Sequence, residues 1–188
     1  MPSQVYSTTA PIPSQELLDR NVKYATEVHK PKLGKDHWGH IPHHAVITCM
    51  DSRINPHEQL GLGVNDTAIM RNVGGDVTEI LTTILAAQTF GVRHFVVLKH
   101  TDCGGYYLSG NDIINHSKSH AKDPKAIDQA DEGRLVNKLK DFGFGSSTIE
   151  EIVLKDVDYL KKNPLIYEET EVSGWVFDDE TGKIRQVA

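Results

Sequence analysis

The sequence predicts an α/β protein, with a central, mainly parallel β-sheet flanked by helices and a C-terminal antiparallel hairpin. Short apolar runs rich in β-branched residues alternate with segments of helical spacing, an order typical of right-handed βαβ units. With 188 residues, of which 38% are hydrophobic, the chain is long enough to build one sizeable core. We therefore expect residues 1–188 to form a single domain.

The first helix is expected near the N-terminus. Residues 1–14 are rich in Pro, Ser and Thr and are expected to form a flexible arm. Ser14 then has the character of an N-cap, and the apolar residues after it have the spacing of an amphipathic helix that runs to about residue 29. The Pro, Gly and His content of residues 31–44 indicates a loop.

The sheet and its helices are expected between residue 45 and the C-terminus. Asp76 and Glu79 suggest a capping box for a helix that ends at about Gly91. Residues 106–134 are polar and are expected to form loop with short helices, whereas a longer helix starts at Ser147. Gly182 suits the turn of the final hairpin. The strands are expected at residues 45–48, 67–73, 94–98, 174–177 and 183–187.

The composition argues against two classes of partner. The net charge is −6 at pH 7, so the chain has no basic excess for neutralising phosphates, and we expect it to bind neither nucleic acid nor an acidic membrane. No stretch approaches the roughly 18 to 20 apolar residues of a transmembrane helix, and the first residues lack the pattern of a signal peptide. A cytoplasmic protein with a small-molecule substrate is the simplest expectation.

Both cysteines of the sequence lie just after predicted strands. Cys49 follows one strand, and His100 and Cys103 follow another. Because carboxyl ends of neighbouring parallel strands meet at one edge of a sheet, two thiols and one imidazole should converge there. Zn²⁺ fits this donor set and keeps a fourth position open if the site is catalytic. Taken singly, each cysteine could be an inert buried thiol and the histidine a structural one, but their coincidence favours a metal site.

An acid and a base accompany the first cysteine. Asp51 is near enough to Cys49 to accept a hydrogen bond from a water on the metal, or to take the fourth position itself. Arg53 would hold that carboxylate in a bidentate pair, although the two residues alone could form a plain salt bridge. Residues 61–63 (GLG) do not make a dinucleotide loop, and Gly74-Gly75 is interpreted as a turn before a helix. The histidines other than His100 are assigned no role.

Three motifs together resemble the β-class carbonic anhydrases. They are CMDSR at residues 49–53, RNVGG at residues 71–75 and HTDCGG at residues 100–105, and the resemblance extends from about residue 44 to the C-terminus. It implies that Cys49, His100 and Cys103 bind zinc and that Asp51 and Arg53 form a catalytic dyad. It also implies an α/β fold, a homodimer or a dimer-based oligomer, and reversible hydration of CO2 to bicarbonate and a proton by zinc-bound hydroxide.

The same resemblance leaves other functions open. The chain is short, like the compact branch of the family, which includes carbonyl sulfide and carbon disulfide hydrolases with the same zinc ligands. Hydrolysis of carbonyl sulfide to hydrogen sulfide and CO2 is therefore the alternative activity. A third interpretation is a non-catalytic zinc protein with Asp51 as a permanent fourth ligand. Some family members close at low pH in that way.

Overall fold

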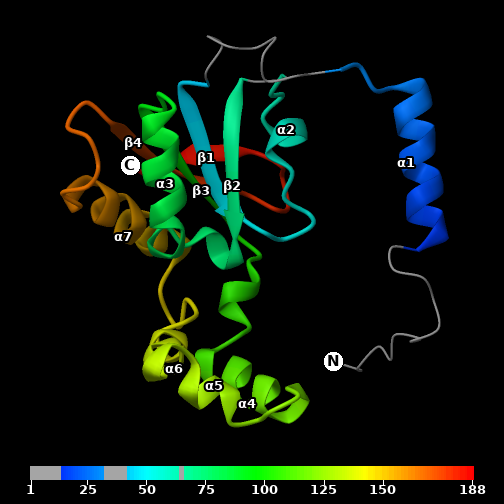
Figure 1. Cartoon of the computed structure of the whole chain (residues 1–188). Helices are drawn as coiled ribbons and strands as arrows, with labels where there is room; N and C mark the ends of the chain where they lie inside the picture. The colour runs from blue at the N-terminus through cyan, green and yellow to red at the C-terminus, as the bar shows by residue number, and fades with distance from the viewer. Residues whose placement is uncertain (1–13, 32–41, 64–65) are drawn as a thin grey trace. The chain divides into compact units, whose positions relative to one another are not determined.

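The computed structural model describes residues 14–31, 42–63 and 66–188 (Figure 1). Its contacts divide the chain into two units, residues 1–39 and residues 40–188. The predicted arm lies outside the described residues except for Ser14, as does most of the predicted loop after the first helix. The prediction of a single domain stays a prediction.

The first unit contains one described helix, α1 (Gln15–Glu27). Its N-cap is Ser14, whose hydroxyl oxygen accepts a hydrogen bond from the backbone N–H of Leu17 at 3.4 Å. This confirms the predicted helix start, because a serine side chain satisfies one of the N–H groups that have no partner within the helix. No residue of α1 is buried.

The second unit is built on a five-stranded sheet in the order β2-β1-β3-β4-β5. Four strands run parallel, and β5 pairs antiparallel with β4, which confirms the predicted fold class. The registers place Cys49 opposite Asn72 and His100 opposite Phe177, so the chemistry-bearing residues lie at the carboxyl ends of central strands. The strands are β1 (His44–Cys49), β2 (Thr67–Asn72), β3 (His94–His100), β4 (Glu171–Phe177) and β5 (Ile184–Gln186).

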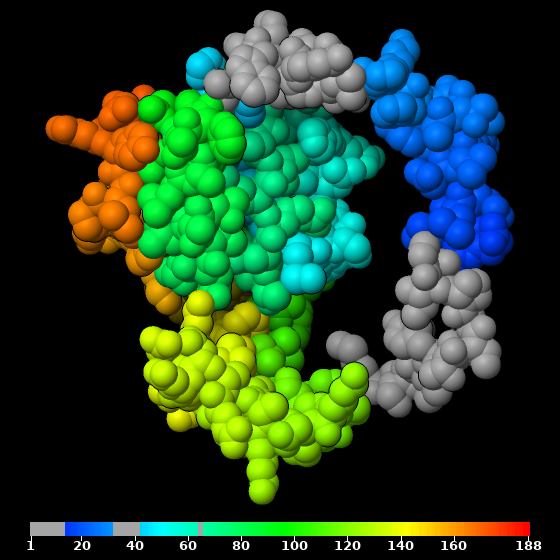
Figure 2. Space-filling model, viewed as in Figure 1, coloured from blue at the N-terminus to red at the C-terminus, as the bar shows by residue number. Residues whose placement is uncertain are grey.

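Helices connect these strands, and the described residues also include four short 3-10 turns. In Figure 1, α3 and α7 lie on one face of the sheet and α2 on the other, while α4, α5 and α6 form a lobe beyond the strand ends, which is also visible in Figure 2. The helices are α2 (Pro56–Gln59), α3 (Leu81–Thr89), α4 (Gly110–His120), α5 (Ala126–Gln129), α6 (Arg134–Lys140) and α7 (Ile149–Lys162). The 3-10 turns are η2 (Val73–Gly75), η3 (Thr78–Ile80), η4 (Gly104–Tyr106) and η5 (Ala130–Gly133).

The larger part of the core lies between the sheet and the two helices α3 and α7. Phe95 and Val97 of β3 are fully buried there, together with Val153 of α7. The approach of α7 depends on Gly174 of β4, since a Cβ atom at that position would lie only 2.4 Å from the side chain of Val153. This packing brings α7 against the strands whose ends carry the candidate site. A smaller buried cluster on the other face contains Val46, Ile54, Leu98 and Phe177.

Two predicted details of the helix starts are wrong. Asp76 and Glu79 make no capping box: the Asp76 carboxylate accepts from the backbone N–H and hydroxyl of Thr78, both at 2.7 Å, and Glu79 pairs with Lys138 at 2.6 Å. A 3-10 turn therefore intervenes, and α3 begins only at Leu81.

The second wrong detail concerns α7. This helix is capped by Thr148, one residue after the expected start, in a capping box with Glu151. The polar segment after Cys103 also contains more helix than expected, because the eleven-residue α4 has a capping box of its own, formed by Ser109 and Asp112.

Within the described ranges, no helix combines the length and the apolar character needed to span a bilayer.

Candidate metal centre

The strand ends bring the three predicted metal ligands together. One ligand atom from each of Cys49, His100 and Cys103 lies within 4.8 Å of the other two, and all three residues are buried. The two Sγ atoms are 3.8 Å apart. Two sulfurs bound to one tetrahedral zinc at about 2.3 Å would lie about 3.8 Å apart. The spacing therefore fits a metal ion of this kind.

The His100 ring is oriented as a metal ligand would be. Its Nδ1 lies 3.0 Å from Oδ2 of Asp179, whereas its Nε2 is buried and has no hydrogen-bond partner among the described residues. A buried polar atom without a partner is costly, and a bound cation would satisfy it. Because a carboxylate on one ring nitrogen fixes the proton there, the other nitrogen is left with a free lone pair. Burial lowers the pKa of His100, but the neighbouring Cys49 and Asp179 side chains outweigh it and raise the pKa overall.

The two thiols have opposite tendencies to ionise. The Cys103 thiol donates a hydrogen bond to Cys49, which lowers the pKa of Cys49 to about 4 although burial opposes the change. The same contact and burial raise the pKa of Cys103. The backbone N–H groups of Asp51 and Gly74 also favour the Cys49 thiolate. A thiolate is the form that binds a metal, so the chain favours it at one cysteine even without an ion.

Asp51 and Arg53 form the predicted bidentate pair. Arg53 donates from Nε to Oδ1 of Asp51 at 3.0 Å and from Nη2 to Oδ2 at 2.7 Å, and its backbone N–H donates to Oδ1 at 2.9 Å. These contacts hold the pKa of Asp51 well below its usual range. Both carboxylate oxygens face the guanidinium, and Asp51 is not part of the group of mutually close ligand atoms.

A second carboxylate engages the outer edge of Arg53. Arg53 Nη1 donates to Oδ2 of Asp102 at 2.6 Å, and its Nη2 donates to the backbone oxygen of Asp102 at 2.8 Å. Tyr107 donates its hydroxyl to the other oxygen of Asp102 at 2.9 Å. The guanidinium is thus fixed between two acids, which restricts the rotamers of Arg53.

Arg71 holds the backbone of the loop that carries the dyad. Its Nε donates to the carbonyl oxygen of Cys49 at 3.0 Å, and its Nη2 donates to that of Asp51 at 2.5 Å. The sequence motif RNVGG includes this residue, but spacing gives no indication of the contact. The arginine stabilises the turn after β1, because otherwise these carbonyls would need water or another donor.

Sequence reasoning missed Asp179 entirely. The segment DDETG indicates only a turn, and the three neighbouring acids in it are chemically similar. The pairing of β3 with β4 singles out Asp179, whose Oδ2 accepts from His100 and, at 2.8 Å, from the backbone N–H of Asp102. One signal could have indicated such a residue: a histidine that binds a metal usually donates its other ring N–H to a carboxylate or a backbone carbonyl.

Replacing Asp179 with alanine is expected to weaken zinc binding by about ten- to a hundredfold, the usual effect of removing a partner that orients a metal ligand. His100 loses the acceptor for Nδ1, and its ring can then rotate or adopt the other tautomer. Competition with a chromophoric chelator measures the affinity. Glu180→Ala, at an exposed neighbouring position, is the matched control and should bind zinc like the parent protein. Equal affinity in the two variants would remove Asp179 from the site.

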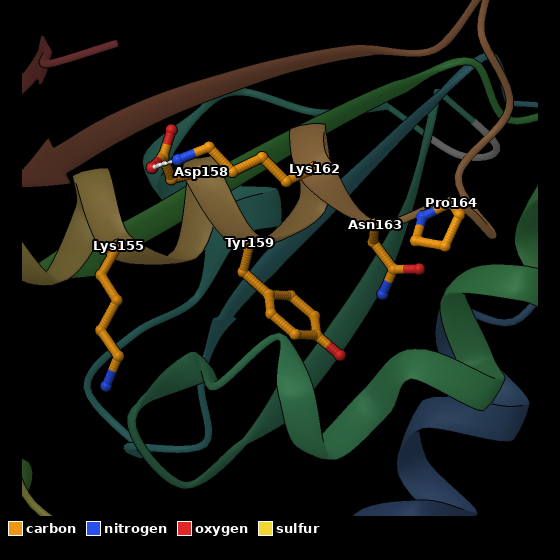
Figure 3. A pocket seen from close by; sticks show the side chains of 6 residues that line it. All are labelled: Lys155, Asp158, Tyr159, Lys162, Asn163 and Pro164. Atoms are coloured by element: carbon orange, nitrogen blue, oxygen red, sulfur yellow. Dashed lines mark hydrogen bonds and ion pairs between the residues drawn. The ribbon is translucent and has the colours of Figure 1, made fainter.

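A further hollow of about 470 Å³ lies on α7, lined by Lys155, Asp158, Tyr159, Lys162, Asn163 and Pro164 (Figure 3). One of its two lysines, Lys162, is paired with Asp158 at 2.5 Å. None of the candidate metal ligands lines this hollow. This hollow is therefore separate from the candidate metal centre.

Comparisons with known proteins agree with this geometry. The family model described as carbonic anhydrase matches residues 44–184. A carbon disulfide hydrolase of Saccharolobus solfataricus is 31% identical over 75% of each chain, and β-carbonic anhydrase 1 of Mycobacterium tuberculosis is 27% identical over 93% of this chain and 97% of its own. The crystal structure of a carbonic anhydrase from Streptococcus mutans superposes with a TM-score of 0.71, at 32% identity, over 92% of this chain and 96% of that one. The chain therefore belongs to the β-carbonic anhydrase family.

Proposed function

We propose that the protein is a zinc enzyme that reversibly hydrates CO2 to bicarbonate and a proton. The observation that carries the proposal is the Asp51–Arg53 pair beside the Cys49, His100 and Cys103 cluster. A structural site needs four protein ligands, whereas this cluster offers three, and the nearby carboxylate is engaged by a guanidinium. Such an arrangement leaves a fourth ligand position for water.

Each residue then has a defined task. Cys49, His100 and Cys103 would hold the ion, and Asp179 would keep the Nε2 lone pair of His100 available. Zinc bound in this way supplies Lewis-acid activation of a water molecule. Asp51 would accept a hydrogen bond from that water and direct its lone pair at the substrate carbon, while Arg53 keeps the carboxylate ionised and in place.

The proton released by the reaction must leave the site. Asp51 is a poor store for it, because its pKa lies well below the usual range. We therefore assign Asp51 an orienting role, with release of the proton to buffer. This assignment predicts little accumulation of protonated Asp51 at neutral pH.

Hydrolysis of a sulfur analogue of CO2 is the second candidate. It is supported by carbon disulfide hydrolases among the curated relatives, at 30% to 31% identity over about three quarters of this chain. The same activated water can add to the carbon of carbonyl sulfide, giving hydrogen sulfide and CO2. Carbon disulfide takes two waters and gives two molecules of hydrogen sulfide and one of CO2. The candidate ligands and the dyad serve either reaction, so substrate choice depends on access and on the shape of the pocket.

The test is a parallel assay of one metal-quantified preparation. Stopped-flow hydration of CO2 is measured beside sulfide release from carbonyl sulfide and from carbon disulfide, with Cys49→Ser as the blank. We expect CO2 hydration with kcat/KM at least about a hundredfold above either sulfide reaction, a difference of about 2.7 kcal/mol in transition-state stabilisation. Efficient sulfide release with weak hydration would replace the proposed substrate while keeping the mechanism.

The proposal also includes assembly and location. We propose a homodimer or dimer-based oligomer, as the family resemblance implies, and a location in the cytoplasm. The non-catalytic alternative predicts a closed site. Azide should perturb the optical spectrum of the cobalt-loaded protein if the fourth position is open, and should leave it unchanged if Asp51 occupies that position permanently.

A further inference from the structure

A buried ion pair lies behind the candidate metal centre. Lys99, the residue before His100 on β3, is only 2% exposed, and Asp156 of α7 is 6% exposed. Their Nζ and Oδ2 atoms are 2.5 Å apart. Charged side chains are almost never buried to this extent unless they are paired, because removing them from water is expensive. The proposed function assigns no role to either residue.

The Lys99 ammonium has three oxygen partners, one for each of its hydrogens. Besides Asp156, its Nζ donates to the backbone oxygen of Gly74 at 3.0 Å and to that of Gly75 at 2.6 Å. The lysine therefore connects three elements: α7, the strand β3 on which it lies, and the Gly74–Gly75 turn after β2. This geometry restricts the turn from inside the protein.

The Gly74–Gly75 turn also contacts the backbone that carries Cys49. Both glycines have positive φ values, 66° and 64°, which other residues adopt only with strain. A Cβ atom at Gly75 would lie 2.9 Å from the carbonyl carbon of Thr48 and 3.2 Å from the nitrogen of Cys49. The two backbones are thus in direct contact, so a displaced turn would displace Cys49.

We propose that Lys99 and Asp156 are positioning residues for the candidate metal centre: their ion pair holds the Gly74–Gly75 turn, and the turn holds the peptide that carries Cys49. The inference rests on the proposed function in taking Cys49 as a metal ligand. Stability alone does not account for the pair, since apolar replacement of a buried ion pair is often neutral or stabilising. A fixed turn, by contrast, fixes the position of one sulfur.

The test replaces both charges together, because removing one would leave the other buried and unpaired. Lys99→Met combined with Asp156→Leu keeps similar side-chain volumes. We expect a folded protein by circular dichroism with zinc affinity reduced about tenfold, the lower end of what outer partners of a metal site contribute. In the cobalt-loaded protein, the thiolate-to-cobalt charge-transfer band should change in energy or intensity.

The matched control is Lys155→Met. Lys155 is the residue before Asp156 on the same helix, and it is exposed, with its side chain extending from α7 in Figure 3. This variant carries the same lysine-to-methionine change at an exposed position next to Asp156. It should keep the zinc affinity and the cobalt spectrum of the parent protein.

Should the double variant fail to fold, Lys99→Gln with Asp156→Asn retains polar groups in the same place. Its glutamine amide has two hydrogens for three acceptors, so we expect changes in the same direction but smaller. If either double variant folds and keeps the parent's zinc affinity and cobalt spectrum, the inference is overturned. The proposed function would stand. A parent protein that binds no cobalt at Cys49 would overturn the proposed function and this inference with it.

Discussion

Cys49→Ser is expected to abolish stoichiometric zinc binding. Partners that merely orient a ligand contribute about ten- to a hundredfold in affinity, so loss of a ligand itself should exceed a hundredfold. A serine hydroxyl is not ionised at neutral pH, whereas hydrogen bonding within the cluster lowers the pKa of Cys49 to about 4. Metal content by mass spectrometry and affinity by chelator competition measure the loss. CO2 hydration and sulfide release should both fall to the rates measured without protein.

The same variant tests the link between metal and fold. Binding free energy of a structural or catalytic ion adds to folding free energy, because the site does not exist in the unfolded chain. Chelation should therefore lower the Tm of the parent protein and leave the Tm of Cys49→Ser unchanged. Met50→Leu, at an adjacent exposed position, is the control and should respond like the parent. Full zinc occupancy in Cys49→Ser would remove this residue from the ligand set.

The convergence of Cys49 and His100 was predictable because it depends only on strand order. Each residue ends a run of β-branched and apolar residues, and parallel strands align their carboxyl ends at one edge of the sheet. The bidentate contact of Asp51 with Arg53 was predictable for a related reason. Because the two residues lie two positions apart in one turn, their side chains can meet without a long-range contact.

The supporting residues were not predictable, because their contacts depend on long-range register. Asp179 reaches His100 only because β4 pairs with β3 and the following turn folds back over the strand end. Asp156 reaches Lys99 only because α7 packs closely on Gly174. In the sequence, Lys99 is a charge inside an apolar strand, which is a local conflict. Such conflicts are most frequent at functional sites. The charge of Lys99 therefore indicated a functional position, which the periodicity of apolar residues does not reveal.

The wrong capping box has a different origin. Asp76 and Glu79 have the spacing of a box, but Asp76 finds a nearer donor in Thr78, and Glu79 finds Lys138 of α6. The competing contact with α6 joins residues far apart in the sequence. Side-chain hydrogen bonding to a local turn competes with helix capping, and spacing alone does not decide between them.

Asp51→Asn is expected to keep the metal and lose most of the turnover. Asparagine has nearly the same shape, so the loop held by Arg71 should persist. Its amide, however, carries no charge and presents only one acceptor oxygen, so it cannot both pair bidentately with Arg53 and orient water. We expect kcat to fall by about a hundredfold, the lower range for loss of a positioned acid or base. Zinc affinity should stay close to that of the parent protein, because Asp51 is not part of the group of mutually close ligand atoms.

The measurement is kcat and KM for the best of the three substrates (CO2, carbonyl sulfide and carbon disulfide) on preparations with equal zinc content. A loss confined to kcat indicates an interaction made in the transition state, whereas a loss confined to KM would assign Asp51 to substrate binding alone. Asp158→Asn is the control, because its pair with Lys162 is exposed and contributes little. Parent-like turnover in Asp51→Asn would refute the dyad. Loss of zinc in that variant would instead make Asp51 a ligand, which favours the closed, non-catalytic interpretation over an enzyme.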